Sequence, residues 1–74
     1  MVKELSDHAF IVLNVIARAN PFRGRGADLA LVCHQSKDLT MNALVVLRDR
    51  RLITMSGTYI RPTQLGIQTV RARP

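Results

Sequence analysis

One stretch, Leu47–Gly66, constrains the fold of this 74-residue chain more than any other. It holds two short runs typical of β-strands, Leu52–Met55 and Thr58–Arg61, on either side of a Ser56-Gly57 turn. Most of the remaining sequence shows helical spacing of apolar residues. We therefore expect a small, mainly helical domain with one β-hairpin. The functional question is whether this hairpin belongs only to the core or also touches a partner.

Capping residues and apolar spacing predict four helices. They are expected at residues 6–19, 27–33, about 39–50 and about 64–71. The pair Asn20-Pro21 ends the first helix, because proline disfavours helical backbone at the residue before it. Either Ser36 or Asp38 caps the third helix, and Thr63 caps the fourth. The expected order is α-α-α-β-β-α in a single domain spanning residues 1–74.

The same pattern predicts the core. The residues expected to face inward are Ala43, Leu44 and Leu47 in the third helix, Leu52, Ile53 and Ile60 in the hairpin, and Phe22 in a loop. This loop, Pro21–Gly26, reads PFRGRG and also carries Arg23 and Arg25. Its two arginines can reach a phosphate, or they can be ordinary solvated charges.

The charge is strongly positive. There are 11 basic and 5 acidic residues, for a formal net charge of +6, and every basic residue except Lys3 and Lys37 is arginine. The planar guanidinium group suits two-point contacts to phosphates and guanine edges. Charge alone does not separate DNA from RNA or an anionic membrane. With only Phe10, Phe22 and Tyr59 as aromatics, base stacking on single strands or RNA is the weaker expectation.

Other classes of function find little support in the sequence. The lone Cys33 rules out an intrachain disulfide and a multi-cysteine zinc site, and His8 and His34 lack metal-ligand spacing, so no metal or cofactor is expected. No catalytic triad or phosphate-binding glycine loop is recognisable, so we do not expect an enzyme. The longest apolar run, Ala9–Leu13, is too short to span a bilayer. We expect a cytoplasmic protein associated with the nucleoid.

The segment Asp28–Gly66 carries a family resemblance. An apolar helix, a polar turn and a second helix precede Leu47–Ile53 (LRDRRLI), and the hairpin is followed by Pro62–Gly66 (PTQLG). This stretch resembles the winged helix-turn-helix domains of bacterial and archaeal regulators, the MarR-like group among them, which commonly read L-x-x-x-G-L-I and L-T-x-x-G. Two positions depart from the pattern: Arg51 takes the usual glycine slot, and Pro62 replaces leucine, which suits the end of an edge strand.

The resemblance implies a small prokaryotic or phage regulator that binds specific double-stranded DNA as a homodimer. Its third helix would enter the major groove, and its wing would touch the backbone. The residues expected at base edges are Ser36, Lys37, Thr40, Met41 and Asn42. Those expected at phosphates are Arg23, Arg25, Arg48, Arg50 and Arg61, with Thr58 and Tyr59 at the minor groove or sugar-phosphate backbone. Apolar residues of the first and last helices are candidates for the dimer contact.

Several of these residues have a purely structural alternative. Lys37 and Asn42 can be ordinary surface residues. Thr40 can be semi-buried, Met41 can fill a gap or a dimer contact, and Tyr59 can pack on the third helix.

The exposed side of the third helix also leaves a different function open. Asp38 and Asp49 would repel phosphate there, and Val45 and Val46 are apolar. Such a patch is typical of a protein interface. The alternative is therefore a protein-interaction module that uses the winged-helix surface.

Overall fold

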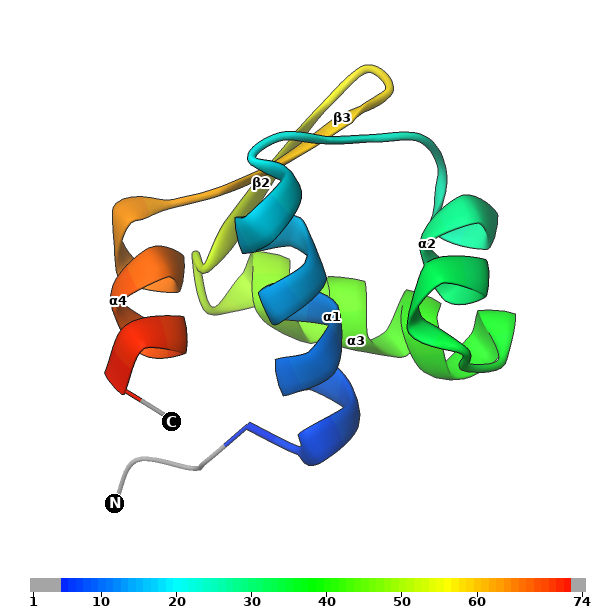
Figure 1. The fold of residues 1–74 in the computed structure, drawn as a ribbon, viewed down its shortest axis with the longest axis horizontal. Coiled ribbons are helices and arrows are strands. Elements are labelled where there is room, and N and C mark those ends of the chain that lie inside the picture. The colour runs from blue at the N-terminus through cyan, green and yellow to red at the C-terminus, as the bar shows by residue number, and fades with distance from the viewer. Residues whose placement is uncertain (1–4, 73–74) are drawn as a thin grey trace.

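The computed structural model describes residues 5–72 and confirms the expected fold class (Figure 1). The helices are α1 (Asp7–Ala19), α2 (Gly26–Cys33), α3 (Lys37–Asp49) and α4 (Gln64–Ala72). The strands are β1 (Phe22–Arg23), β2 (Ile53–Ser56) and β3 (Tyr59–Pro62). The predicted order of helices and hairpin strands is correct, and the arrangement is that of a winged helix-turn-helix domain with one additional strand, β1, between α1 and α2.

Side-chain caps fix where the helices begin. The Ser36 hydroxyl accepts a hydrogen bond from the Leu39 N–H at 3.2 Å, so Ser36 rather than Asp38 is the N-cap of α3. For this reason α3 begins two residues before the predicted start. The Thr63 hydroxyl accepts from the Gly66 N–H at 3.0 Å, which confirms Thr63 as the cap of α4.

The segment Pro21–Gly26 was expected to be a loop, and that expectation is wrong for its first part. Phe22 pairs with Ile60, and Arg23 pairs with Tyr59, so β1 adds a third antiparallel strand to the hairpin. The strand order is β1-β3-β2. A two-residue strand has no alternating pattern of its own, and its partner lies far along the chain.

The hairpin differs from the prediction in two details. Ser56 pairs with Tyr59, so the turn consists of Gly57 and Thr58, one residue later than expected. Gly57 has a φ of +59°, which suits glycine. The strand β3 is the central strand rather than an edge strand, and Pro62 is tolerated because it is the last residue of β3, beyond the part that pairs with β1.

The core forms where α1 crosses α3 beneath the sheet (Figure 1). Val12, Leu13 and Ile16 of α1 are completely buried. All the predicted core residues are buried as expected: Phe22, Ala43, Leu44, Leu47, Leu52, Ile53 and Ile60. The inward faces of α3 and the sheet thus pack into the core, and their outward faces are exposed.

The junction between α3 and β2 has a left-handed residue. Arg51 adopts a φ of +61°. Its N–H donates to the Arg48 carbonyl, and the Leu52 N–H donates to the Leu47 carbonyl, both at 2.9 Å. This pair of hydrogen bonds is the Schellman arrangement, in which glycine usually takes the left-handed position.

Candidate nucleic-acid interface

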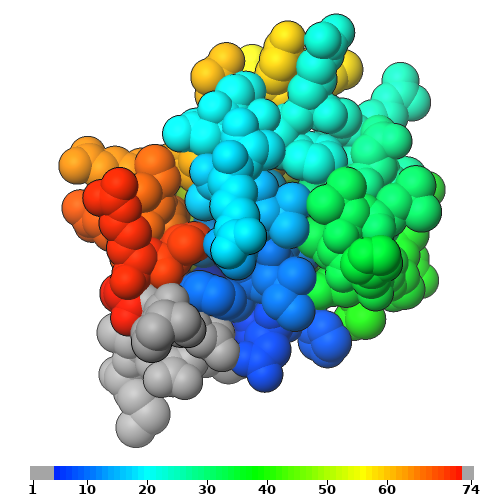
Figure 2. Space-filling view, viewed as in Figure 1, coloured from blue at the N-terminus to red at the C-terminus, as the bar shows by residue number. Residues whose placement is uncertain are grey.

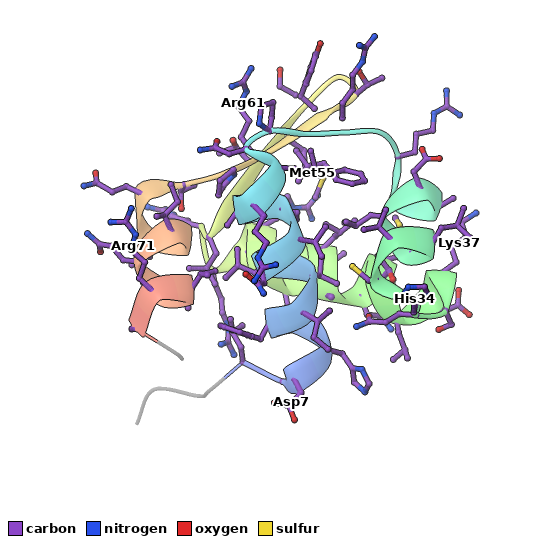
Figure 3. All side chains as sticks on the ribbon, viewed as in Figure 1. Asp7, His34, Lys37, Met55, Arg61 and Arg71 are labelled. Carbon is purple, nitrogen blue, oxygen red and sulfur yellow. The ribbon has the colours of Figure 1, made fainter. Side chains whose placement is uncertain are left out.

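The first turns of α3 present a polar surface. Ser36, Lys37, Met41 and Asn42 are all exposed, although the Ser36 hydroxyl is already engaged as the cap of α3. The preceding turn is closed by His34, which has a φ of +55° and donates from its N–H to carbonyls of α2. Figure 3 shows Lys37 projecting outward beside this turn. Lys37 and Asn42 therefore remain accessible at the start of the expected reading helix.

Thr40 does not belong to this surface. It is completely buried, and its hydroxyl donates to the Ser36 carbonyl at 3.0 Å. The assignment of Thr40 to a base edge is therefore wrong, because it lies on the same side of α3 as Ala43 and Leu47, which face the core.

Met41 joins α3 to the beginning of α2. Its side chain is 43% exposed, and its sulfur lies so close to Gly26 that a Cβ at Gly26 would overlap it. This contact fits the structural alternative in which Met41 fills a gap. It also brings the exposed edge of α3 next to Arg25, the residue that precedes α2.

The outward face of the sheet gathers three of the predicted residues. Arg23 lies opposite Tyr59 on the neighbouring strand, and Arg61 follows Tyr59 by two positions, so all three project from one face. The guanidinium carbons of Arg23 and Arg61 lie 6.0 and 5.7 Å from the centre of the Tyr59 ring. Figure 3 shows Arg61 projecting from the sheet, well away from Lys37. Tyr59 thus contacts two arginines rather than packing on α3.

The loop before α2 is tied to the hairpin turn. The Gly24 N–H donates to the Thr58 carbonyl at 2.8 Å, which places exposed Arg25 and exposed Thr58 on either side of this link. The Arg25 N–H donates to the Asp28 carboxylate at 2.9 Å. Arg23, Arg25, Thr58, Tyr59 and Arg61 therefore form one region, which we call the wing face.

Arg48 and Arg50 lie elsewhere, at the far end of α3. Arg48 is exposed, and its Nε is 3.8 Å from the Asp49 carboxylate, a surface pairing that contributes little to stability. Arg50 is half-buried and is the C-cap of α3. These two arginines are not part of the wing face.

The side of α3 opposite the core is neither basic nor uniformly polar. Asp38, Asn42, Val45 and Asp49 follow one another at helical spacing on this side. Apolar side chains around them are also exposed, among them Val46 at 38% and Leu39 at 43%. On the neighbouring helix α2, Leu31 is 76% exposed. We call the exposed side chains Leu39, Val45 and Val46 the α3 apolar patch.

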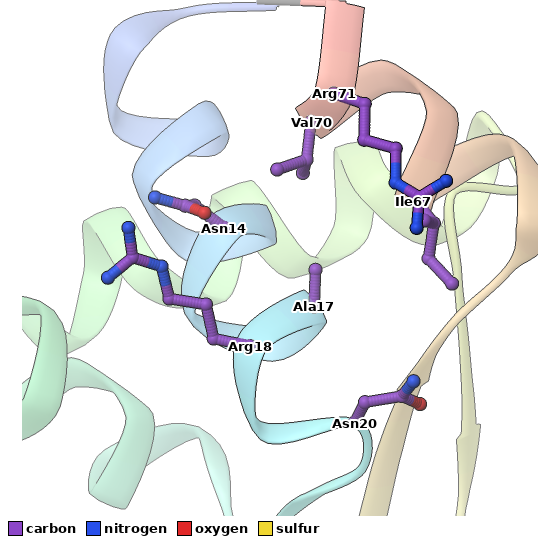
Figure 4. Close-up of a pocket in the computed structure, with 7 residues that line it drawn as sticks. All are labelled: Asn14, Ala17, Arg18, Asn20, Ile67, Val70 and Arg71. Atoms are coloured by element: carbon purple, nitrogen blue, oxygen red, sulfur yellow. The ribbon is translucent and has the colours of Figure 1, made fainter. Parts of the chain in front are cut away.

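A shallow groove of about 380 Å³ lies between α1 and α4 (Figure 4). It is lined by Asn14, Ala17, Arg18, Asn20, Ile67, Val70 and Arg71. Figure 2 shows α1 running down the middle of this side of the molecule between α4 and α2. The apolar residues that line the groove come from the two helices predicted to supply a dimer contact.

The described residues hold no other site of recognisable chemistry. Within residues 5–72, no three His, Cys, Asp or Glu side chains gather where a metal ion could bind. Cys33 is buried, and burial raises the pKa of its thiol above the ordinary value of 9.0, which disfavours the reactive thiolate. None of the helices in this part of the chain has the length and apolar character needed to cross a membrane.

Comparison with known proteins adds no identification. No protein-family model matches the sequence, and no curated protein matches it significantly. The assignment of a function therefore depends on the fold, the exposed residues of α3 and the wing face.

Proposed function

We propose that this chain is a sequence-specific double-stranded DNA-binding protein of the winged helix-turn-helix type, a small transcriptional regulator that works at the nucleoid. The observation that carries the proposal is the combination of two features. Lys37 and Asn42 are exposed at the start of the second helix of a helix-turn-helix pair, and the three-stranded sheet carries exposed Arg23 on β1 and exposed Arg61 on β3. A net charge of +6 favours approach to a polyanion.

In this proposal α3 enters the major groove and the wing face meets the backbone. Asn42 is suited to adenine, because its amide oxygen can accept from the N6 amino group while its amide nitrogen donates to N7. Lys37 is suited to guanine or a phosphate. Arg23, Arg25 and Arg61 supply phosphate contacts, which give affinity without sequence information. Arg48 and Arg50 reach the backbone from the other end of α3.

We further propose that the protein acts as a homodimer. The groove between α1 and α4 leaves Ile67 and Val70 only partly covered, and a second copy packed there would bury them. A two-fold dimer reads two half-sites about one helical turn apart, so its target would be palindromic.

Selection of binding sites from a randomised duplex pool tests the sequence specificity. The proposal predicts that the wild-type protein enriches a common motif. In Asn42→Ala that motif should weaken at one position, while Arg61→Ala should weaken binding to all sequences alike. Failure of the wild type to enrich any motif, or equal loss on selected and random duplexes in Asn42→Ala, would contradict the assigned reading role.

A protein-interaction module is the second candidate, and the α3 apolar patch favours it. Asp38 and Asp49 flank this patch and would repel phosphate, whereas they would suit a partner with a basic rim. Under this alternative, random duplex DNA should not bind even at low ionic strength. We assign the protein no enzymatic role in either case.

A further inference from the structure

We infer that Tyr59 is a positioning residue whose ring holds the Arg23 and Arg61 side chains in place as a preformed pair of phosphate contacts. The inference rests on the proposed DNA binding and adds to it how the wing face engages the backbone. It assigns that role to the ring of Tyr59, not to its hydroxyl group.

The surroundings of these two arginines leave them available for an anion. Thr54 and Ser56 of β2 pair with Arg61 and Tyr59, so the outward face of the sheet carries hydroxyl groups and no carboxylate. Among residues 5–72, neither Arg23 nor Arg61 forms an ion pair. The described part of the outward sheet face is thus uniformly favourable for phosphate.

The contrast with α3 makes this face the better anion site. Arg48 lies beside Asp49, and Asp38 faces outward at the beginning of the helix. Each carboxylate there opposes a nearby phosphate by like-charge repulsion. We therefore expect the sheet face to carry more of the backbone affinity than the sides of α3.

The ring contributes by limiting the freedom of the arginines. A free arginine side chain loses rotamer entropy when it binds a phosphate. A guanidinium group already resting on an aromatic ring has lost part of that freedom in advance. The Tyr59 ring meets this condition for both arginines, because it lies within 6.0 Å of each guanidinium carbon. Phenylalanine should serve equally well, since it keeps the ring.

A double-mutant cycle on one random-sequence duplex tests the role, with fluorescence anisotropy as the readout. Tyr59→Phe should bind like the wild type. Tyr59→Leu, which keeps apolar bulk on the strand, should weaken binding roughly fivefold, because part of the ordering cost of the two arginine side chains would then be met on binding. Arg61→Ala should weaken binding less in the Tyr59→Leu background than in the wild type. A merely structural role would lower the melting temperature but would leave the effect of Arg61→Ala unchanged.

Controls make each outcome decisive. Arg51→Ala removes the same charge from the junction between α3 and β2, outside the wing face, and should have a smaller effect than Arg61→Ala. Binding to a single strand of equal length is measured in parallel. If the wild type binds the single strand more tightly than the duplex, and Tyr59→Leu loses this preference, the ring stacks on bases and the inference is overturned. Equal effects of Arg61→Ala in both backgrounds would also overturn it, while DNA binding itself would stand. If the wild type fails to bind any duplex, the proposed function falls instead.

Discussion

Arg51 has a backbone conformation that residues with a side chain rarely adopt. Its φ of +61° lies in the left-handed region, where a Cβ approaches the following carbonyl oxygen. The position is nevertheless fixed, because the N–H groups of Arg51 and Leu52 close the end of α3. Glycine, the residue expected in this slot, would meet the same geometry without the steric cost.

Arg51→Gly should therefore raise the free energy of unfolding by about 1 kcal/mol. Glycine removes the steric cost of the left-handed backbone, and the greater entropy of glycine in the unfolded chain offsets part of this gain. Urea unfolding followed by circular dichroism measures it. The matched control is Arg50→Gly. Arg50 has an ordinary φ of −86°, so glycine relieves no strain there and only adds entropy to the unfolded chain. This variant should therefore be less stable than the wild type. A loss of stability in Arg51→Gly equal to that in Arg50→Gly would contradict the explanation.

At the residue scale, the sequence marked Arg51 as the residue in a usual glycine position, and it correctly predicted the core residues of α3 and of the hairpin. It also contained the signal that excludes Thr40 from base reading, because Thr40 shares a helical side with Ala43 and Leu47. The contact of Tyr59 with two arginines was not predictable. It depends on the pairing of Arg23 with Tyr59, which no local pattern specifies.

At the scale of elements, α4 is held against the start of β2 by a close backbone approach. Gly66 is buried, and a Cβ there would overlap the Leu52 carbonyl oxygen. That same carbonyl accepts from the Thr63 N–H at 3.0 Å, so it cannot move away without losing a hydrogen bond. The glycine of the PTQLG segment is thus required for packing of α4.

Gly66→Ala should cost at least about 2 kcal/mol of stability, since the backbone must shift to admit the methyl group. Gly57→Ala is the comparison, because nothing lies within 4 Å of a Cβ there and only the positive φ opposes it. We expect about 1 kcal/mol for that variant. Thermal and urea unfolding of both would measure the difference, and equal losses would argue against the steric explanation.

The elements themselves differed in how well the sequence predicted them. Helices with a capping side chain and an apolar stripe, such as α1 and α3, were found within two residues of their observed bounds. The hairpin was found with its turn displaced by one residue. The strand β1 was missed, because its two residues become a strand only through pairing with Tyr59–Ile60.

At the scale of the whole molecule, arginines and carboxylates are unevenly distributed over the surface. The wing face carries Arg23, Arg25 and Arg61, whereas the outward side of α3 carries Asp38 and Asp49. The formal charge of +6 was evident from the sequence, but its distribution required the fold. This distribution favours a protein whose backbone contacts come largely from the wing and whose helix α3 adds a few specific contacts.

The salt dependence of binding to a random-sequence duplex tests the central claim most directly. Each phosphate neutralised should contribute a slope of about −0.9 to log affinity against log salt, so five engaged arginines would give roughly −4.5. Arg61→Ala should make the slope shallower by about 0.9. We predict measurable binding at low ionic strength that falls steeply as salt is added. Undetectable binding at low ionic strength would contradict the DNA-binding account and favour the protein-interaction alternative.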